Sequence, residues 1–213
     1  MPITAPFDAH PDRYDDWFDA HDAAYRSELR AIRSVWPGTH PALDVGVGTG
    51  RFAAPLGVDV GVDPSAEMRK RARQRGIEVR DGTAEALPFD DHRFAAVLNV
   101  TTICFVDRLD LALAETRRVL RPSGVFVVGM IDRDSPLGRQ YREQNDDNPF
   151  YREATFLQAD ALVGAMRSAG FTQIKTRQTL FAPLDAGPAP EPVRDGTGDG
   201  SFVVLRGVAP SAA

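Results

Sequence analysis

The stretch Leu43-Asp44-Val45-Gly46-Val47-Gly48-Thr49-Gly50-Arg51-Phe52-Ala53 decides the fold of this chain. The apolar run at 41–45 predicts a short buried strand, and the alternate glycines after it predict a tight turn before a helix at 50–56. Glycine suits such a turn because it has no Cβ and adopts positive φ at little cost. A helix N-terminus after the turn would present free N–H groups to polar ligand atoms. A dinucleotide fingerprint would require glycine at position 51, so the arginine there argues against a pyrophosphate site.

A second apolar segment, 58–62, ends at an acidic residue. Asp63 stands where the acid of doubly wound nucleoside-binding folds accepts the hydroxyls of a ribose. Pro64 follows it, so Asp63 is also a candidate N-cap for the next helix. The two roles are compatible, and both stay open at this point.

The remaining chain alternates between strand and helix patterns. We expect strands at 41–45, 58–62, 77–80, 94–99 and 124–131, and helices at 50–56, 65–75, 107–120 and 159–169. Two final strands are expected at 171–180 and 201–206, joined by a loop at 182–200 whose Pro, Gly and Asp content predicts no regular structure. This alternation predicts an α/β fold, a doubly wound parallel sheet with helices on both faces.

Five motifs in order, LDVGVGTGRFA, VGVDPS, DGTAEALPF, FAAVLNV and ALAETRRVLRPSGVFVV, resemble those of class I S-adenosylmethionine-dependent methyltransferases of the small-molecule type 11. The resemblance covers about 41–130. It implies a Rossmann-like, seven-stranded sheet, mostly parallel, with a C-terminal antiparallel strand. It also implies S-adenosylmethionine as cofactor and methyl transfer to a small-molecule acceptor. A non-catalytic regulator that binds S-adenosylmethionine or S-adenosylhomocysteine is the alternative, and Arg51 disfavours a nicotinamide-dependent oxidoreductase.

The resemblance also implies a set of binding residues. The cofactor-binding candidates are Tyr14, Asp44, Gly46, Gly48, Gly50, Asp63, Pro64, Thr83, Ala84, Glu85, Asn99 and Val100. Thr83 stands where the family often has an acid that holds the adenine amino group, and its hydroxyl is a weaker, uncharged partner. The substrate-side candidates are Trp17, Thr101, Phe150, Tyr151 and Phe156. No catalytic residue is assigned, although His10 and His21 are candidate general bases.

We expect one methyltransferase domain over 1–213 with four parts. These are an N-terminal helical cap at 1–39, a cofactor-binding core at 41–131, a lid or substrate insertion at 132–157, and a C-terminal helix and hairpin at 158–213. Apolar spacings of three and four over 15–35 predict one or two amphipathic helices in the cap. The insertion mixes aromatic residues with arginines, which favours a small substrate under a lid, with an exposed amphipathic helix as the alternative.

Composition restricts the partners. The 213 residues carry a net charge of −5, so we expect neither a nucleic-acid nor an anionic-membrane partner, and the arginines at 65–75 are interpreted as a solvated helix face. Cys104 is the single cysteine, which excludes an intramolecular disulfide and a thiolate metal cluster and predicts a buried, inert thiol. The N-terminus lacks a leader pattern, and the sequence has no membrane-spanning apolar run, so we expect a cytoplasmic protein. The oligomeric state stays open.

Overall fold

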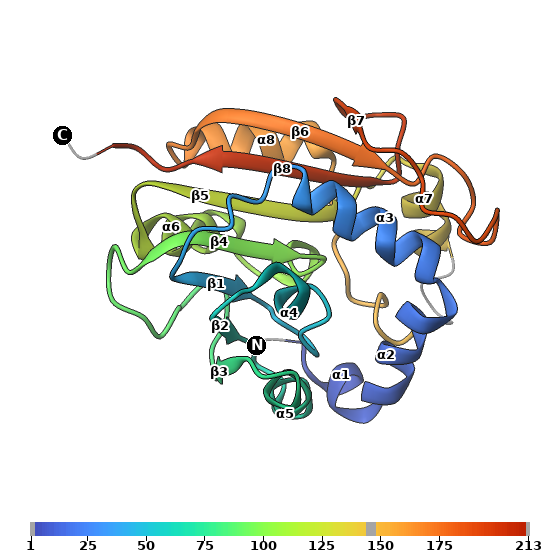
Figure 1. Ribbon diagram of the computed structural model, residues 1–213, viewed down its shortest axis with the longest axis horizontal. Helices are drawn as coiled ribbons and strands as arrows, with labels where there is room; N and C mark the ends of the chain where they lie inside the picture. The colour runs from blue at the N-terminus through green and yellow to red at the C-terminus, as the bar shows by residue number, and fades with distance from the viewer. Residues whose placement is uncertain (1–2, 144–147, 212–213) are drawn as a thin grey trace.

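The computed structural model describes residues 3–143 and 148–211, and the predictions made for 1–2, 144–147 (within the insertion) and 212–213 lie outside these residues. Its centre is one sheet with strand order β3-β2-β1-β4-β5-β8-β6-β7 (Figure 1). The strands are β1 Ala42–Val45, β2 Val60–Val62, β3 Glu78–Arg80, β4 Phe94–Val100, β5 Leu120–Ile131, β6 Thr172–Thr179, β7 Arg194–Asp195 and β8 Phe202–Val208. The five neighbouring strands β3, β2, β1, β4 and β5 are parallel. Strand β8 pairs antiparallel with β5 and with β6, and β6 pairs antiparallel with β7. The predicted doubly wound α/β class is confirmed.

Helices cover both faces of the sheet (Figure 1). They are α1 Ala5–Ala9, α2 Pro11–Ala20, α3 Asp22–Arg33, α4 Ala53–Leu56, α5 Ala66–Gln74, the 3₁₀ helix η1 Ile103–Phe105, α6 Leu109–Val119, α7 Pro136–Glu143 and α8 Ala159–Ser168. Because successive strand side chains point to opposite faces, β4 contributes to two cores. Leu98 packs in the cluster that includes Ile32 of α3, and Val97 packs in the cluster that includes Leu113 of α6.

The sheet has eight strands where the sequence predicts seven. The additional strand is β7, which pairs with β6 inside the 182–200 loop that was predicted to have no regular structure. Polar side chains order this loop. The Gln178 side chain accepts N–H bonds from Asp199 and Gly200 and donates to the carbonyl of Asp195, and Glu191 accepts the N–H of Phe181. Side-chain hydrogen bonds of this kind are not visible in Pro- and Gly-rich composition.

The N-terminal cap has three helices: α2 and α3 cover the stretch 15–35, where one or two helices were predicted, and α1 precedes it. Proline lies in the first turn of α1 and of α2, where a missing N–H costs nothing. His10 and His21 interrupt the helical backbone at the two junctions. The cap therefore folds around the edge of the sheet near the carboxyl ends of its strands (Figure 1). Within the described residues, every helix is too short or too polar to cross a bilayer.

Candidate functional site

The glycine-rich turn after β1 is a tight backbone cradle. Gly46, Gly48 and Gly50 have φ values of +74°, +53° and +85°, a region that disfavours side chains. A Cβ on Gly46 would lie 2.2 Å from Cγ2 of Thr102, and one on Gly50 would lie 2.7 Å from Cδ1 of Ile77. Gly46 N also donates to the carbonyl of Val62 at 2.8 Å, which fixes the turn against the end of β2. Gly46 and Gly48 therefore bring bare backbone to the site, whereas Gly50 is required for packing beneath it.

Asp63 lies next to this turn at the end of β2. Its two carboxylate oxygens accept Gly48 N at 2.8 Å and Ser65 N at 2.9 Å. Burial raises the pKa of Asp63 to about 6, and the two backbone hydrogen bonds partly oppose that rise. The N-cap of α5 is Ser65, whose hydroxyl accepts Met68 N, so the candidate N-cap role of Asp63 is wrong. Asp63 instead joins the glycine turn to the start of α5 and keeps a face toward the cavity described below.

Asp44 and Asn99 lie near the carboxyl ends of the neighbouring strands β1 and β4, where Asp44 pairs in register with Leu98, the residue before Asn99. Both are buried, and among the described residues Oδ1 of each has no hydrogen-bond partner. Burial, with the nearby charge of Asp63, raises the pKa of Asp44 well above its ordinary value. Asn99 uses its Nδ2 to donate to the carbonyl of Val45 at 3.2 Å. Each of these oxygens keeps free acceptor capacity near the strand ends.

A cavity of about 370 Å³ lies between the strand ends and the cap. This volume falls in the range of small-molecule sites. Of the predicted cofactor residues it is lined by Tyr14, Gly46, Gly48, Asp63, Pro64 and Val100, and of the predicted substrate residues by Trp17, Thr101, Phe150 and Tyr151. The structure therefore brings both predicted groups to one cavity.

Aromatic rings form the cap side of the cavity. Tyr14 packs edge-on against Phe18 at 5.4 Å and against Phe150 at 5.9 Å between ring centroids. Tyr141 stacks on Tyr151 at 4.6 Å, which joins α7 to the segment after it. The Tyr14–Phe150 contact joins segments far apart in the sequence, and together these contacts give the cap side of the cavity an aromatic lining.

The other predicted residues lie outside the lining of this cavity and stay predictions. Thr83 forms a bridge with Ala86, and Ala84 is buried between them. Glu85 accepts Asp107 N at 2.8 Å, close to the start of α6. Phe156 lies against a second, smaller cavity behind Tyr151. Asp44 and Asn99 lie near the ends of β1 and β4, and Gly50 lies in the turn, where it packs toward Ile77.

The two candidate bases also lie outside the cavity lining. His10 and His21 are the residues at which the cap helices are interrupted. His21 bonds the carbonyl of Trp17 through Nδ1 at 2.9 Å and stacks on its ring at 4.8 Å. Cys104 is buried as predicted, and burial raises the pKa of its thiol to about 12.

Sequence reasoning missed Glu28 of α3. Its residue is 3% exposed, it lines the cavity, and no hydrogen bond to its side chain is present among the described residues. Burial raises its pKa to about 8. A signal was available, because Glu28 is spaced three residues after Tyr25 and four before Ile32, on the apolar side of the expected helix.

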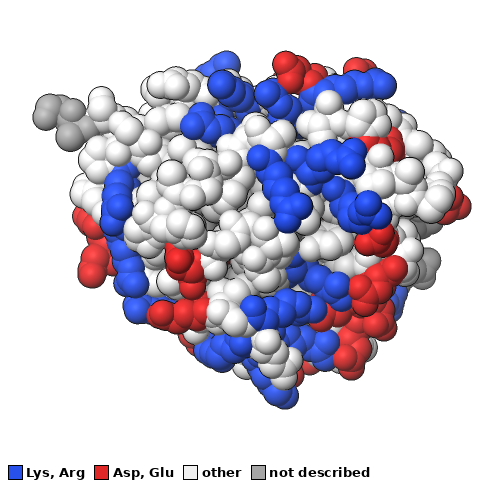
Figure 2. Space-filling view, in the orientation of Figure 1, with Lys and Arg blue, Asp and Glu red and all other residues white. Residues whose placement is uncertain are grey.

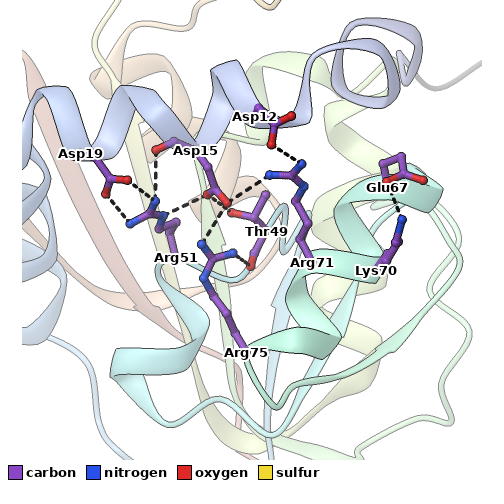
Figure 3. A network of polar contacts seen from close by, with 9 residues as sticks. All are labelled: Asp12, Asp15, Asp19, Thr49, Arg51, Glu67, Lys70, Arg71 and Arg75. Atoms are coloured by element: carbon purple, nitrogen blue, oxygen red, sulfur yellow. Dashed lines mark hydrogen bonds and ion pairs between the residues drawn. The ribbon is translucent and has the colours of Figure 1, made fainter.

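A polar network holds the cap helix α2 onto the glycine turn and α5 (Figure 3). Asp15 accepts Thr49 Oγ1 at 2.7 Å, Arg51 Nε at 2.9 Å and Arg75 Nη2 at 2.9 Å. Burial opposes ionisation of Asp15, but these hydrogen bonds hold its pKa below the ordinary value. Arg71 reaches Asp12 at 2.6 Å. Over α2 and α5 acidic and basic side chains accordingly lie next to one another (Figure 2).

The interpretation of the α5 arginines as a solvated face is therefore wrong for Arg69, Arg71 and Arg75, whereas Arg73 is exposed. Arg71 and Arg75 bind the cap, Arg73 donates to the carbonyl of Val79, and Arg69 donates to the carbonyls of Asp63 and Pro64. The arginine side chains of the two cap pairs are only 22% and 29% exposed. Their partners lie about sixty positions away in the chain, which explains why local pattern could not identify them.

The doubly wound sheet, the glycine turn after β1 and the buried carboxylate after β2 together define a Rossmann-like enzyme that binds a nucleoside cofactor at the strand ends. Comparisons with known proteins specify the class. The methyltransferase domain family matches residues 43–128. An uncharacterized protein of Methanocaldococcus jannaschii is 40% identical over 93% of this chain and 96% of its own length.

A solved structure from Thermotoga maritima, named "SAM-dependent methyltransferase, possible histamine N-methyltransferase", is similar at TM-score 0.92. It is 44% identical and covers 96% of this chain and 98% of its own. A ubiquinone biosynthesis O-methyltransferase of Azorhizobium caulinodans is 28% identical over 77% of this chain and 68% of its own length. The chain belongs to the class I, type 11 methyltransferase family and is an S-adenosylmethionine-dependent methyltransferase.

The residues present fit S-adenosylmethionine. The turn is a cradle that a Cβ would fill, and Asp63 keeps lone pairs toward the cavity after accepting two backbone N–H groups. The unpartnered oxygen of Asp44 adds a second acceptor beneath the turn. Acceptors of this kind match a cofactor that carries hydroxyl, ammonium and sulfonium groups.

Proposed function

We propose that this methyltransferase modifies a small molecule that binds in the cap half of the cavity, beside the bound cofactor. The single observation that carries the proposal is the shared cavity. Gly46, Gly48 and Asp63 line one side of it, and the cap aromatics, among them Trp17 and Phe150, line the other. A cavity of about 370 Å³ under three cap helices suits a small acceptor better than a folded macromolecule.

The cofactor half of the site would be formed by residues of the strand ends. Asp63 would accept the ribose hydroxyls, and the backbone of Gly46 and Gly48 would hold the amino-acid part, with Asp44 beneath it. Tyr14 would close the site from above, since its hydroxyl would lie 3.1 Å from a Cβ placed on Gly48. Thr83, Ala84, Glu85, Asn99, Val100 and Pro64 complete the proposed cofactor contacts, and Gly50 supports the turn.

The protein would act mainly by orientation. S-adenosylmethionine, when bound, supplies an electrophilic methyl carbon attached to a sulfonium. The cap aromatics and Thr101 would hold the acceptor so that a lone pair on its N, O or C nucleophile faces that carbon. Methyl transfer would leave the C–S bonding electrons on S-adenosylhomocysteine, and a proton carried by the N or O nucleophile would pass to solvent. Orientation and exclusion of water can lower such a barrier by about 7–11 kcal/mol without a dedicated catalytic base.

The cofactor assignment is tested by calorimetric titration with S-adenosylhomocysteine, and NAD serves as the negative control. We expect binding of the first ligand only. Asp63→Asn should weaken it by at least tenfold, since charge-assisted hydrogen bonds contribute about 1.5–3 kcal/mol. Asp81→Asn is the matched control, because Asp81 is 73% exposed and pairs with Arg69 just after β3. Equal affinity in the two variants would remove Asp63 from the cofactor site.

The acceptor class is tested by formation of S-adenosylhomocysteine with sets of small amines, alcohols, carboxylic acids and phenols. The relatives name both N- and O-methylation, so neither acceptor atom is assumed. We expect turnover with at least one small molecule and none with bulk tRNA or denatured protein. Turnover with a macromolecule alone would contradict the small-molecule proposal while leaving the cofactor assignment in place.

A further inference from the structure

Glu28 occupies an unusual position for a carboxyl group. It lies on the apolar side of α3, 3% exposed, and its side chain reaches the cavity instead of solvent. Burying a carboxyl without a partner is costly, and among the described residues none bonds to it. Unpartnered buried polar groups in a cavity are expected to be satisfied by a ligand.

Glu28 lies away from the cofactor half of the cavity. Helix α3 packs against β5, β6 and β8, whereas the glycine turn and Asp63 follow β1 and β2. Strands β4 and β1 separate β5 from β2 in the sheet, and Figure 1 shows α3 and α5 over opposite ends of it. The carboxyl is therefore placed for the acceptor, not for the ribose.

Three tyrosines line the same cavity as the carboxyl. Burial raises the pKa of the Tyr14, Tyr141 and Tyr151 hydroxyls, and the negative charge of Glu28 adds to the rise in each, which places all three within electrostatic range of it. Tyr141 stacks on Tyr151, and Tyr14 packs against Phe150. A carboxylate flanked by aromatic faces is the chemistry that recognises a substituted ammonium, through a charge-assisted hydrogen bond and cation–π contacts.

The other charged groups on the cavity do not supply this chemistry. Arg13 and Asp16 of α2 are exposed at its rim, and Asp63 is already bonded to two backbone N–H groups. Among the charged residues that line the cavity within the described chain, Glu28 alone is both buried and without a partner.

We propose that Glu28 binds the ammonium group of a small amine acceptor, with an aromatic or apolar body, in the cage formed by Tyr14, Tyr141 and Tyr151. This inference rests on the proposed function and narrows its acceptor to amines. The methylated atom is not specified by it, since the ammonium is an anchoring point whose place relative to the reacting atom depends on the body of the amine.

The test is calorimetric titration of the protein saturated with S-adenosylhomocysteine. The probes are 2-phenylethylamine, histamine and 3-methylbutylamine, each compared with the corresponding alcohol. We expect at least one amine to bind tenfold or more tightly than its alcohol. Glu28→Gln should abolish that preference and leave alcohol affinity unchanged, because glutamine keeps the shape and removes the charge. Asp22→Asn is the matched control, since Asp22 lies on the same helix but its side chain is 60% exposed.

Several outcomes would overturn the inference. One is the absence of binding by every amine probe while S-adenosylhomocysteine binds normally, and another is an amine preference that survives in Glu28→Gln. A third is a loss in Glu28→Gln of affinity for S-adenosylmethionine relative to S-adenosylhomocysteine, with amine preference intact, which would assign Glu28 to the sulfonium. Failure of S-adenosylhomocysteine itself to bind would instead contradict the proposed function.

A measurement on the unaltered protein guards against a variant that does not fold. At pH 7 the free amine and the Glu28 carboxyl each carry a proton, because burial raises the carboxyl pKa to about 8. In the bound pair the amine keeps its proton and the carboxyl loses its own. Amine binding should therefore release about one proton to the buffer. Titration in buffers of different ionisation enthalpy counts these protons, and the alcohols should release none. Equal proton release by amine and alcohol would also overturn the inference.

Discussion

The two faces of α2 differ in chemistry and in what they hold. One face carries Asp12, Asp15 and Asp19, spaced three and four apart, and binds arginines of the glycine turn and α5. The other carries Tyr14 and Trp17 and lines the cavity. The charged face is made of matched ion pairs, whereas the aromatic face shares its cavity with a carboxyl that has no protein partner among the described residues. The comparison indicates that ion pairs hold the outer face of α2 in place, whereas the carboxyl in the cavity on its inner side has no protein partner among the described residues.

The largest effect on the free energy of unfolding is expected from the unpartnered carboxyl of Glu28. The pKa of Glu28 is raised from 4.5 to about 8, so the folded protein holds this proton more tightly than the unfolded chain does. Its contribution to stability is complete below pH 4.5 and is lost as pH rises toward 8. The loss amounts to about 1.4 kcal/mol per pH unit, or on the order of 5 kcal/mol across this range.

Glu28→Gln removes this titration. The variant should therefore gain in free energy of unfolding relative to the parent between pH 5 and 8, and the difference should be constant at higher pH. Urea unfolding of both proteins at each pH unit measures it. Asp63 also titrates in this range, but it is present in both proteins and cancels. A difference that does not change with pH would show that Glu28 is ionised throughout and partnered.

An intermediate effect is expected on the charged face. Asp15→Asn would remove the carboxylate that Arg51 and Arg75 share. The Asp15 side chain is only 14% exposed, so water cannot readily replace it. The expected loss of stability is about 2–3 kcal/mol, because breaking a largely buried pair leaves uncompensated charge. Asp19→Asn is the matched control, since Asp19 is 69% exposed and binds the same Arg51. Its loss should stay below about 1 kcal/mol.

Salt separates these two variants. In 1 M NaCl the loss in Asp19→Asn should disappear through screening, while that in Asp15→Asn should persist because its partners are partly desolvated. Urea unfolding at low and high salt provides the measurement. Equal losses at both salt concentrations for both variants would mean that the two aspartates contribute alike, and that burial does not distinguish the inner from the outer pair.

The sequence predicts the half of the site that local pattern encodes. The strand, glycine turn and second acidic strand end are contiguous signals, and Gly46, Gly48 and Asp63 indeed line one cavity. Backbone geometry explains why the turn lies at the cavity, since only glycine fits a turn whose Cβ would lie 2.2 Å from Thr102. The same is true of the parallel sheet, whose alternating strands and helices follow directly from apolar periodicity.

Non-local pairing accounts for what the sequence does not predict. Arg75 faces solvent by helical pattern, yet Asp15 reaches it across the cap at 2.9 Å. Glu28 is an acidic residue on the apolar face of its helix. Its proposed role as a binding residue depends on Tyr141, which belongs to another helix and is electrostatically coupled to it. The β7 pairing depends in the same way on the Gln178 side chain ordering a loop of turn-forming composition. To predict any of these three features, one must know which distant segment of the chain packs against it.

The smallest effect is expected where the two faces of α2 meet the turn. Gly48 has φ +53°, and a Cβ there would lie 3.1 Å from the Tyr14 hydroxyl, while the neighbouring Thr49 binds Asp15. Gly48→Ala should cost about 1–2 kcal/mol of stability from its left-handed backbone. Gly57→Ala should cost the same, because Gly57 has φ +69° and its nearest contact, His40, is 4.0 Å from the added Cβ.

Cofactor affinity distinguishes these two alanine variants. Gly48→Ala displaces Tyr14 and fills the cradle, so titration should show a loss of S-adenosylhomocysteine affinity of about fivefold or more, whereas Gly57→Ala should bind like the parent protein. A charged face that holds α2 rigidly prevents Tyr14 from moving aside, so relaxing that face with Asp15→Asn should reduce the penalty of Gly48→Ala. Simple additivity of the two changes would instead show that the ionic and aromatic faces of α2 act independently.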